Sequence, residues 1–528
     1  MRLQKFLMPA WLIGIAVMLV LPSAAAAAWH RAETDHFIFY GTSAKDVRED
    51  AIRLERYDTL LRDLTKIPKG SATMKLTIYV LSDVEAVKRA YGDRTSDVAG
   101  FYTTNPSGVI AVVPRGIGEK DYDDVILFHE YAHHLMLQYF PTAYPAWYSE
   151  GFAEYLSTAQ FTDIAAKIGL PANHRAYQLL IEEPVPIETL LSAGVGDLKR
   201  DQVGNFYGRA WLLTHFLSFE KTRRGQQSEC LTLINNGMAP LEAARKAFGD
   251  LAVLNKDLNR YMKAPRIAYL NVPNTPPAAT SITVTELDRA TGEALMDRLL
   301  LTRGTALAER QPIANRLRKL SGKYPGNASV LTLLAEAEHD LGNHDAAVVA
   351  ADAAIAIEPA NVRALLWKGM SLGRALSKAN DKDAAKWKAA RNWIVRANRA
   401  NPEDPFPLYE YFQSFQAEGR DPTKAAVAGL GKAVSLIPQE SAFRVPYAIE
   451  LANAGDYSGA AMILQPIANS PHDGFAKSAR FLMTRLRTAA AKPGEKVDMK
   501  ALMAELNKDD DSTEKKEPNP PVPPPPAK

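Results

Sequence analysis

The chain has 528 residues, of which 47% are hydrophobic and 23% are charged, and its formal net charge is +3. This composition is that of an ordinary globular protein, long enough for two to four domains. The small net charge and the lack of a basic patch interleaved with aromatic residues exclude nucleic acid as an expected partner. A single cysteine, Cys230, excludes an intramolecular disulfide and a cysteine-based zinc site.

The amino terminus predicts an export signal. Two basic residues precede an apolar run over residues 6–21, and residues 24–28 are all alanine. This order predicts a secretory signal peptide over residues 1–28. The apolar run is short for a membrane span, so we expect no stable span after cleavage, with an uncleaved anchor as the open alternative. A signal peptide on a cysteine-poor chain predicts a periplasmic or secreted bacterial protein.

Strand patterns precede helical patterns over residues 29–270. Residues 35–40 and 75–81 are rich in β-branched and aromatic residues, which predicts strands. Apolar residues at helical spacing predict a helix over 45–64, and residues 98–113 resemble a hairpin. Helical patterns dominate the remainder of this region. The order indicates an α+β domain whose cleft lies between two lobes.

The most informative motif is His129-Glu130-Tyr131-Ala132-His133, which follows an acidic first turn and an apolar run. On a helix, His129 and His133 lie on one face. Two imidazoles in that relation can hold one Zn²⁺ and leave positions for a third ligand and a water. Glu130 lies beside them, where it can take a proton from that water. The motif therefore predicts a zinc centre with Glu130 as general base.

A second block, Trp147-Tyr148-Ser149-Glu150-Gly151-Phe152-Ala153, leaves room after His133 for a loop and the start of another helix. Glu150 would then project from that helix towards the metal. With this block the sequence resembles the gluzincin metallopeptidases, the thermolysin and aminopeptidase N group. The likeness extends to a loosely defined set of bacterial peptidase MA-like proteins, many of which carry helical repeats. The resemblance implies a zincin-like metallopeptidase domain with Glu150 as the third zinc ligand.

The resemblance covers about residues 95–215, a span that includes the zinc motif, and implies two further roles. Glu154, one helical turn after Glu150, would orient a ligand histidine and fix its tautomer. Tyr207 lies in the segment Phe206-Tyr207-Gly208-Arg209-Ala210-Trp211-Leu212-Leu213. By resemblance to the aminopeptidases, Tyr207 would donate a hydrogen bond to the developing oxyanion, a role suited to a phenol.

One departure from the aminopeptidases concerns the amino terminus of the substrate. Those enzymes hold it with the Glu of a Gly-x-Met-Glu-Asn segment, but the corresponding residues 100–113 contain no Glu. A strand at 109–113 can still pair with an extended peptide. Internal cleavage is therefore favoured over removal of the first residue. An aminopeptidase that uses another carboxylate, such as Glu154 or Glu119, is the open alternative, and the export-associated zinc proteases with repeats rank below both.

The character of the sequence changes after residue 290. Alanine becomes frequent, and proline recurs at intervals of 34, 43, 36 and 33 residues, from Pro325 through Pro359, Pro402 and Pro438 to Pro471. A period near 34 predicts tetratricopeptide-like repeats, each a helix pair that packs on its neighbours. We expect a linker over 271–290 that can contain one strand, a helical solenoid over 291–490, and a disordered Pro-rich tail over 491–528.

These observations predict an exported zinc-dependent peptidase with a helical-repeat domain at its carboxyl end. Its expected partners are a peptide or protein substrate and a protein bound by the repeats. The alternative is a non-catalytic zinc-binding scaffold or adaptor, in which the repeats bind other proteins.

Overall fold

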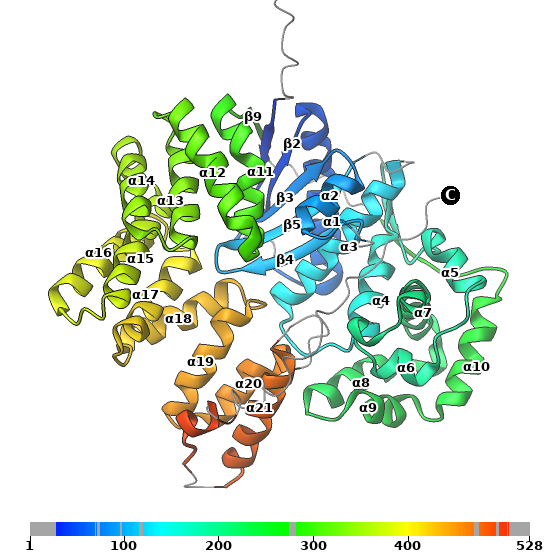
Figure 1. The fold of residues 1–528 in the computed structure, drawn as a ribbon. Coiled ribbons are helices and arrows are strands. Elements are labelled where there is room, and N and C mark those ends of the chain that lie inside the picture. The colour runs from blue at the N-terminus through cyan, green and yellow to red at the C-terminus, as the bar shows by residue number, and fades with distance from the viewer. Residues whose placement is uncertain are drawn as a thin grey trace, which may run out of the picture.

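The computed structural model describes residues 28–68, 70, 74–94, 98–115, 120–273, 281–468, 475–492, 496–503 and 505. The predicted signal peptide lies outside these residues except for Ala28, and so do Glu119 and the Pro-rich end of the tail. A sheet with helices on both faces lies near the centre of the molecule, and paired helices curve around one side of it (Figure 1). Within the described residues, no helix combines the length and apolar character that crossing a membrane requires.

A six-stranded mixed sheet forms the core of the first half, in the order β4-β5-β3-β2-β1-β9. Strands β2, β3 and β5 run parallel to one another, whereas β4, β1 and β9 pair antiparallel with their neighbours. The edge strand β4 forms the predicted hairpin with β5. The strands are β1 (His30–Glu33), β2 (Phe37–Gly41), β3 (Leu76–Leu81), β4 (Phe101–Asn105), β5 (Gly108–Pro114) and β9 (Thr283–Glu286).

Helices cover both faces of this sheet, so β5 is buried along its whole length. Alternate residues of β5 enter two cores, because successive side chains of a strand point to opposite faces. Val109, Ala111 and Val113 pack in the core that contains α1 (Ala44–Thr65) and α3 (Lys120–Tyr139). Ile110 and Val112 pack in a core with residues of α2 (Val84–Tyr91) and α11 (Arg289–Arg303). The first helix of the second half therefore completes the core of the first.

A helical layer beside the sheet contains α4 (Ala146–Ser157), which packs against α3 and α7 (Arg200–Phe219). Helices α4 and α7 come unusually close at Gly151, where an added Cβ would lie 2.3 Å from the carbonyl oxygen of Ala210. Glycine at position 151 thus allows α4 to pack close to α7, and this packing fixes the position of the neighbouring Glu150 relative to α3. The layer also contains α5 (Ala176–Leu180), α6 (Ile187–Ser192), α8 (Gln226–Asn235), α9 (Pro240–Phe248), α10 (Leu251–Met262) and the small sheet β6 (Gln160–Phe161), β7 (Ala165–Ile168) and β8 (Leu270–Pro273).

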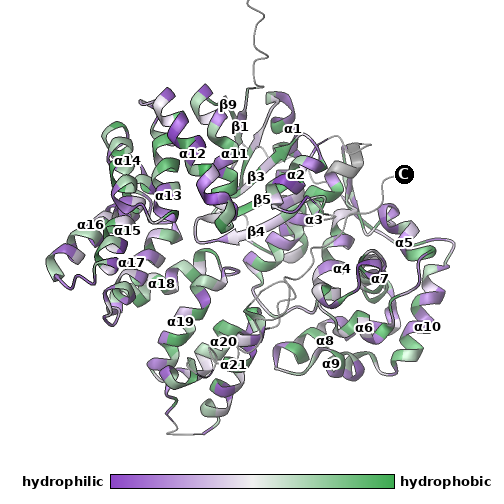
Figure 2. Ribbon diagram, viewed as in Figure 1, coloured by the Kyte–Doolittle hydropathy of each residue, from purple (hydrophilic) through white to green (hydrophobic). Residues whose placement is uncertain are grey.

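The second half consists of antiparallel helix pairs that pack in sequence order. Small residues lie at the helix contacts: Ala347, Ala351 and Ala354 of one helix are fully buried. Hydrophilic and hydrophobic residues occupy different sides of the helices (Figure 2). These pairs form the predicted helical-repeat architecture. After α11 the helices are α12 (Leu307–Lys323), α13 (Ala328–Asp340), α14 (His344–Ile357), α15 (Val362–Lys378), α16 (Ala384–Ala400), α17 (Pro405–Glu418), α18 (Lys424–Leu436), α19 (Ser441–Asn453), α20 (Tyr457–Ala468) and α21 (Ala476–Ala490).

Two segments differ from their prediction. The expected linker over 271–290 supplies strands to both sheets: β8 pairs with β7, and β9 pairs with β1. The disordered tail was predicted to start at residue 491, which is too early. Residues 499–503 are helical, and Met499 and Leu502 are buried in a core with α20 and α21. In both segments, apolar or β-prone residues pack on elements that are distant in the sequence. Local sequence patterns cannot predict such contacts.

Candidate metal centre

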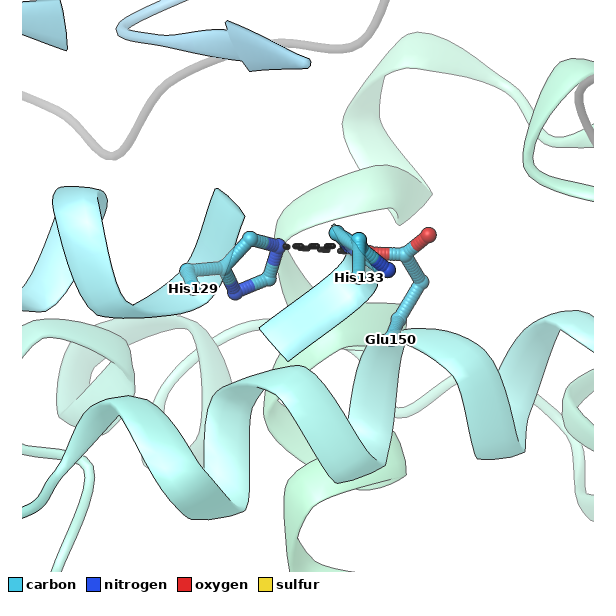
Figure 3. Close-up of side chains that lie close together, drawn as sticks. All are labelled: His129, His133 and Glu150. Carbon is cyan, nitrogen blue, oxygen red and sulfur yellow. Dashed lines mark hydrogen bonds and ion pairs between the residues drawn. The ribbon is translucent and has the colours of Figure 1, made fainter. Parts of the chain in front are cut away.

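Two helices bring His129, His133 and Glu150 together. The imidazoles project from α3 and the carboxylate projects from α4, and the three groups point towards one another (Figure 3). The Nε2 atoms of His129 and His133 are 3.1 Å apart. Oε2 of Glu150 lies 3.5 Å from Nε2 of His129 and 3.4 Å from Nε2 of His133. The predicted ligand set therefore converges on one point.

The spacing of these atoms can be tested against zinc. Ligand atoms at zinc-binding distance in a tetrahedron lie about 3.3–3.5 Å from one another. The three measured separations of 3.1, 3.5 and 3.4 Å match one face of such a tetrahedron. Two imidazole nitrogens and one carboxylate oxygen are also a donor set that zinc accepts, with the fourth position left for water or substrate. The residues present thus fit a zinc ion.

Glu154 lies behind this ligand set. Its Oε1 is 3.7 Å from Nδ1 of His129, the ring nitrogen that faces away from the centre. Nε2 of His174 lies 2.6 Å from the carboxylate, and the Arg175 guanidinium donates to it at 2.6 and 2.9 Å. Burial alone would raise the pKa of Glu154, but the charges of Arg175 and His174 hold it well below its usual range. An ionised carboxylate here favours a proton on Nδ1 and leaves the Nε2 lone pair of His129 for a metal.

Glu130 lines the same cleft as the ligand set. Its carboxylate lies close to the backbone ahead of β4, where a Cβ added to Gly100 would be 3.6 Å from Oε1 of Glu130. A side chain at position 100 would also come within 2.6 Å of Ile126. Glycine at this position therefore leaves room for Ile126, which lies one helical turn before Glu130 on α3.

Tyr207 reaches the cleft from α7. Its ring centre is 6.2 Å from that of His129, and the Arg175 guanidinium lies over the ring, 4.9 Å from its centre. Burial and the negative charge of Glu150 raise the pKa of Tyr207 well above its usual value. The phenol therefore keeps its proton and can act as a hydrogen-bond donor. Arg175 contacts both Glu154 and Tyr207, so it ties the two side chains together, a role that the sequence motifs did not suggest.

The cleft has a volume of about 540 Å³, and its far wall comes from the repeat half. Gln439, Glu440 and Ser441, at the start of α19, line it together with Pro466 and Phe475. Cross-domain hydrogen bonds fix this wall. Gln439 Nε2 donates to the Tyr102 hydroxyl at 2.9 Å, and the Thr104 hydroxyl donates to Glu440 at 2.9 Å. The partners are more than 300 residues apart in the chain, so no local signal could have predicted the contact.

Two other histidine groups do not form part of the centre. His134 faces away from it, with Nδ1 3.2 Å from the Tyr102 hydroxyl, and burial lowers its pKa to about 3. His36, Glu55 and Asp58 also place ligand-type atoms within 4.8 Å of one another. There, however, Nδ1 of His36 lies 2.8 Å from Glu55 and Asp58 holds Arg62 through two bonds, so the cluster is explained as an ion-pair network.

Comparison with known proteins gives matches to solved structures alone. No family model matches the chain, and no curated protein matches it. A thermophilic TPR protein from Thermus thermophilus shares 15% identity at a TM-score of 0.31, covering 38% of this chain and 99% of its own. MamA from Desulfovibrio magneticus RS-1 (residues 41 to the end) shares 17% identity at a TM-score of 0.25, covering 40% of this chain and 99% of its own. Yeast Tom70 shares 12% identity at a TM-score of 0.25, covering 75% of this chain and 79% of its own.

These findings correct the assignment to the gluzincin metallopeptidases. No family model matches the chain, so the likeness of short motifs does not extend to a family. The reason lies in the size of the motif: two histidines four residues apart share a face on any helix, so the motif carries local chemistry but not a family or a fold. The helical-repeat assignment rests on the paired helices themselves, and no family follows for the mixed sheet.

Proposed function

We propose that the protein is a zinc-dependent hydrolase of peptide bonds in which His129, His133 and Glu150 bind the metal. One observation carries the proposal: the three donor atoms have the mutual spacing of zinc ligands and lie in a cleft that Glu130 also lines. Metal ligands with a neighbouring carboxylate are the minimum set for metal-assisted hydrolysis. We further propose, from the predicted signal peptide, that the protein acts in the periplasm or outside the cell.

The residues of the cleft divide the chemistry among them. When bound, zinc supplies a Lewis acid that polarises the scissile carbonyl and lowers the pKa of a bound water. Glu130 takes a proton from the water and passes it to the leaving amine. Tyr207, protonated in this environment, donates a hydrogen bond to the carbonyl oxygen as negative charge develops there. Glu154 holds His129 in the tautomer that binds the metal.

An extended peptide is the substrate that this cleft suits. Residues of β4 line it, and β4 is an edge strand that pairs with β5 on one side. An edge strand can hold a peptide by main-chain hydrogen bonds. The wall from α19 and the volume of about 540 Å³ favour a short or unfolded chain over a folded protein. Cleavage within the peptide is favoured over aminopeptidase action, because Glu154 is occupied by His174 and Arg175.

Metal analysis combined with peptide-library digestion tests this proposal. The purified protein is expected to hold about one zinc per chain, and Glu130→Gln is expected to keep the zinc but cleave peptides about 10²–10⁴-fold more slowly. His133→Ala should lose both metal and activity, whereas the adjacent control His134→Asn should keep both. Wild-type protein that cleaves peptides equally well after chelation would overturn the metal-dependent mechanism. Unchanged hydrolysis by Glu130→Gln would remove Glu130 as the base.

A second candidate function is a zinc-binding adaptor without catalysis. The repeat half favours it, because successive helix pairs are an architecture that often binds proteins. In this case the metal would stabilise the contact between α3 and α4. Protein that binds zinc, cleaves no member of a broad peptide library and is cross-linked to a protein partner through its repeat helices would favour the adaptor over the hydrolase.

A further inference from the structure

A second cavity, of about 590 Å³, lies between the central sheet and the repeat helices. One wall consists of residues of β3, β5 and the β4–β5 turn, including Tyr79 and Ser107. The other wall includes Arg298 from α11, Glu336 from α13 and Arg363 from α15. Its lining shares no residue with the cleft of the zinc centre. It is therefore a separate site, formed where the two halves of the chain meet.

Two charged groups of this cavity lack a direct partner of opposite charge. Within the described residues, Glu336 forms no hydrogen bond and no ion pair, and burial raises its pKa to about 8 although the charges of Arg363 and Arg298 oppose the shift. Arg298 lies over the Tyr40 ring at 5.5 Å and contacts the Tyr79 hydroxyl, but it forms no ion pair in the described part of the chain. Arg298 can therefore meet an anionic group of a ligand. Glu336 is largely protonated at neutral pH with this raised pKa, and it would ionise when a cationic ligand group binds beside it. The charged form of a sheltered group without a direct partner is unfavourable, so the placement of both groups calls for an explanation.

Arg363 adds a third polar group. Its Nη2 donates to the Ser107 carbonyl at 2.7 Å and lies 3.3 Å from Asp404, but its Nη1 is buried without a hydrogen-bond partner. Guanidinium groups with spare N–H donors suit a carboxylate, which they can bind through two parallel hydrogen bonds. The cavity thus offers donors for an anion on the side of the two arginines and an acceptor for a cation at Glu336.

We propose that this cavity binds a small zwitterion, either an amino acid or a short peptide with free ends, whose ammonium group meets Glu336 and whose carboxylate meets Arg298 and Arg363. The volume suits a ligand of this size, since small-molecule sites occupy about 300–1,000 Å³. The ammonium and carboxylate groups of the bound ligand would provide the direct partners that Glu336 and Arg298 lack within the chain. The inference does not depend on the proposed hydrolysis, because it concerns different residues.

Calorimetric titration of the full-length Glu130→Gln protein tests the site without cleavage of the probe. The probes are trialanine with free ends, trialanine acetylated and amidated at its ends, and alanine. Free trialanine should bind at least tenfold more tightly than the blocked peptide, and a tenfold ratio corresponds to about 1.4 kcal/mol. Adding Glu336→Gln or Arg298→Gln should remove that difference. Comparable binding of alanine would identify the ligand as an amino acid, and binding of trialanine alone would identify a peptide.

A control variant separates the cavity from general charge effects. Asp352→Asn removes one negative charge from the same repeat half, where Asp352 is half exposed, pairs with Lys368 and lies outside both cavities. It should leave binding unchanged. Glu336→Gln should fold normally, because it removes an unpaired buried carboxyl, and Arg298→Gln provides an independent second variant. The proposal is overturned if both variants bind free trialanine as tightly as their parent, or if the free and blocked peptides bind equally.

Discussion

The zinc centre and the second cavity each contain a sheltered carboxyl group, and the surroundings shift the pKa values of the two groups in opposite directions. Glu154 is 1% exposed, yet Arg175 and His174 hold it ionised with a pKa well below its usual range. Glu336 has no such direct partner, and burial raises its pKa to about 8. The first carboxylate is satisfied by the protein and serves to orient another residue. The second, Glu336, has no such partner in the described part of the chain and is available to a ligand. The difference teaches that a buried acid must be judged by its neighbours and not by its depth alone.

The largest effect is expected from Glu154→Ala, which would leave Arg175 and His174 without their carboxylate. Breaking a buried ion pair by removing one partner costs about 3–5 kcal/mol of unfolding free energy. Loss of a group that supports a metal ligand should also weaken zinc binding about 10–100-fold. Chemical denaturation and zinc titration against a competing chelator measure the two quantities.

The control for that experiment is Glu338→Ala in the repeat half. Glu338 is 4% exposed and forms two bonds to Arg318, whose side chain is 39% exposed. Water can therefore solvate Arg318 when its partner is removed, so the stability loss should be smaller and zinc affinity unchanged. An equal loss of zinc affinity in both variants would show that Glu154 acts only through global stability.

Tyr207→Phe removes one hydroxyl from the zinc cleft while keeping the ring and its contacts with His129 and Arg175. Loss of a hydrogen-bond donor to the developing oxyanion is expected to lower kcat about 10²-fold, with zinc content unchanged. Tyr102→Phe is the matched control, since its hydroxyl lies in the same cleft but accepts from Gln439. Steady-state kinetics would contradict the role of Tyr207 if the two variants lost activity equally.

A pair of glycines compares helix packing in the two halves. An alanine at Gly151 would place its Cβ 2.3 Å from the Ala210 carbonyl, and one at Gly369 would lie 2.7 Å from Ile394 and 3.0 Å from the Ala390 carbonyl. Each substitution is expected to cost about 1–3 kcal/mol through overpacking. Only Gly151→Ala should weaken zinc binding, because it displaces α4 and with it Glu150. Thermal unfolding with zinc titration distinguishes this from a general loss of stability.

The last effect is expected from Glu336→Gln, as a change in the pH dependence of stability and not as a loss at one pH. The pKa of Glu336 rises from 4.5 to about 8 on folding, so the native state binds the extra proton between these values. Its contribution to stability is present below pH 4.5 and is lost as the pH rises through 8. The variant should match the parent at about pH 4 and be the more stable of the two at about pH 9. Denaturant titrations at both pH values measure this, and a constant difference would contradict it.

Much of the local structure followed from spacing. Four residues place His129 and His133 on one helix face, and the recurrence of proline and alanine after residue 290 predicted packed helix pairs. The hairpin of β4 and β5 was also expected. The family assignment was wrong, because a short motif constrains one helix and its chemistry rather than a whole fold. The linker was expected to hold at most one strand, but β8 and β9 join two different sheets, and the expected tail packs Met499 against a distant surface.

The sequence by itself determined which residues share a helix face, where the repeats lie and which side chains could hold a metal, because these properties depend on neighbours a few residues away. Only the tertiary structure decided that α4 lies close enough to α3 for Glu150 to join the histidines, that Arg175 supports Glu154, and that α19 closes the cleft. It also created the cavity around Glu336, to which both halves contribute. Such contacts depend on how whole elements pack, and packing joins residues that the chain separates by hundreds of positions.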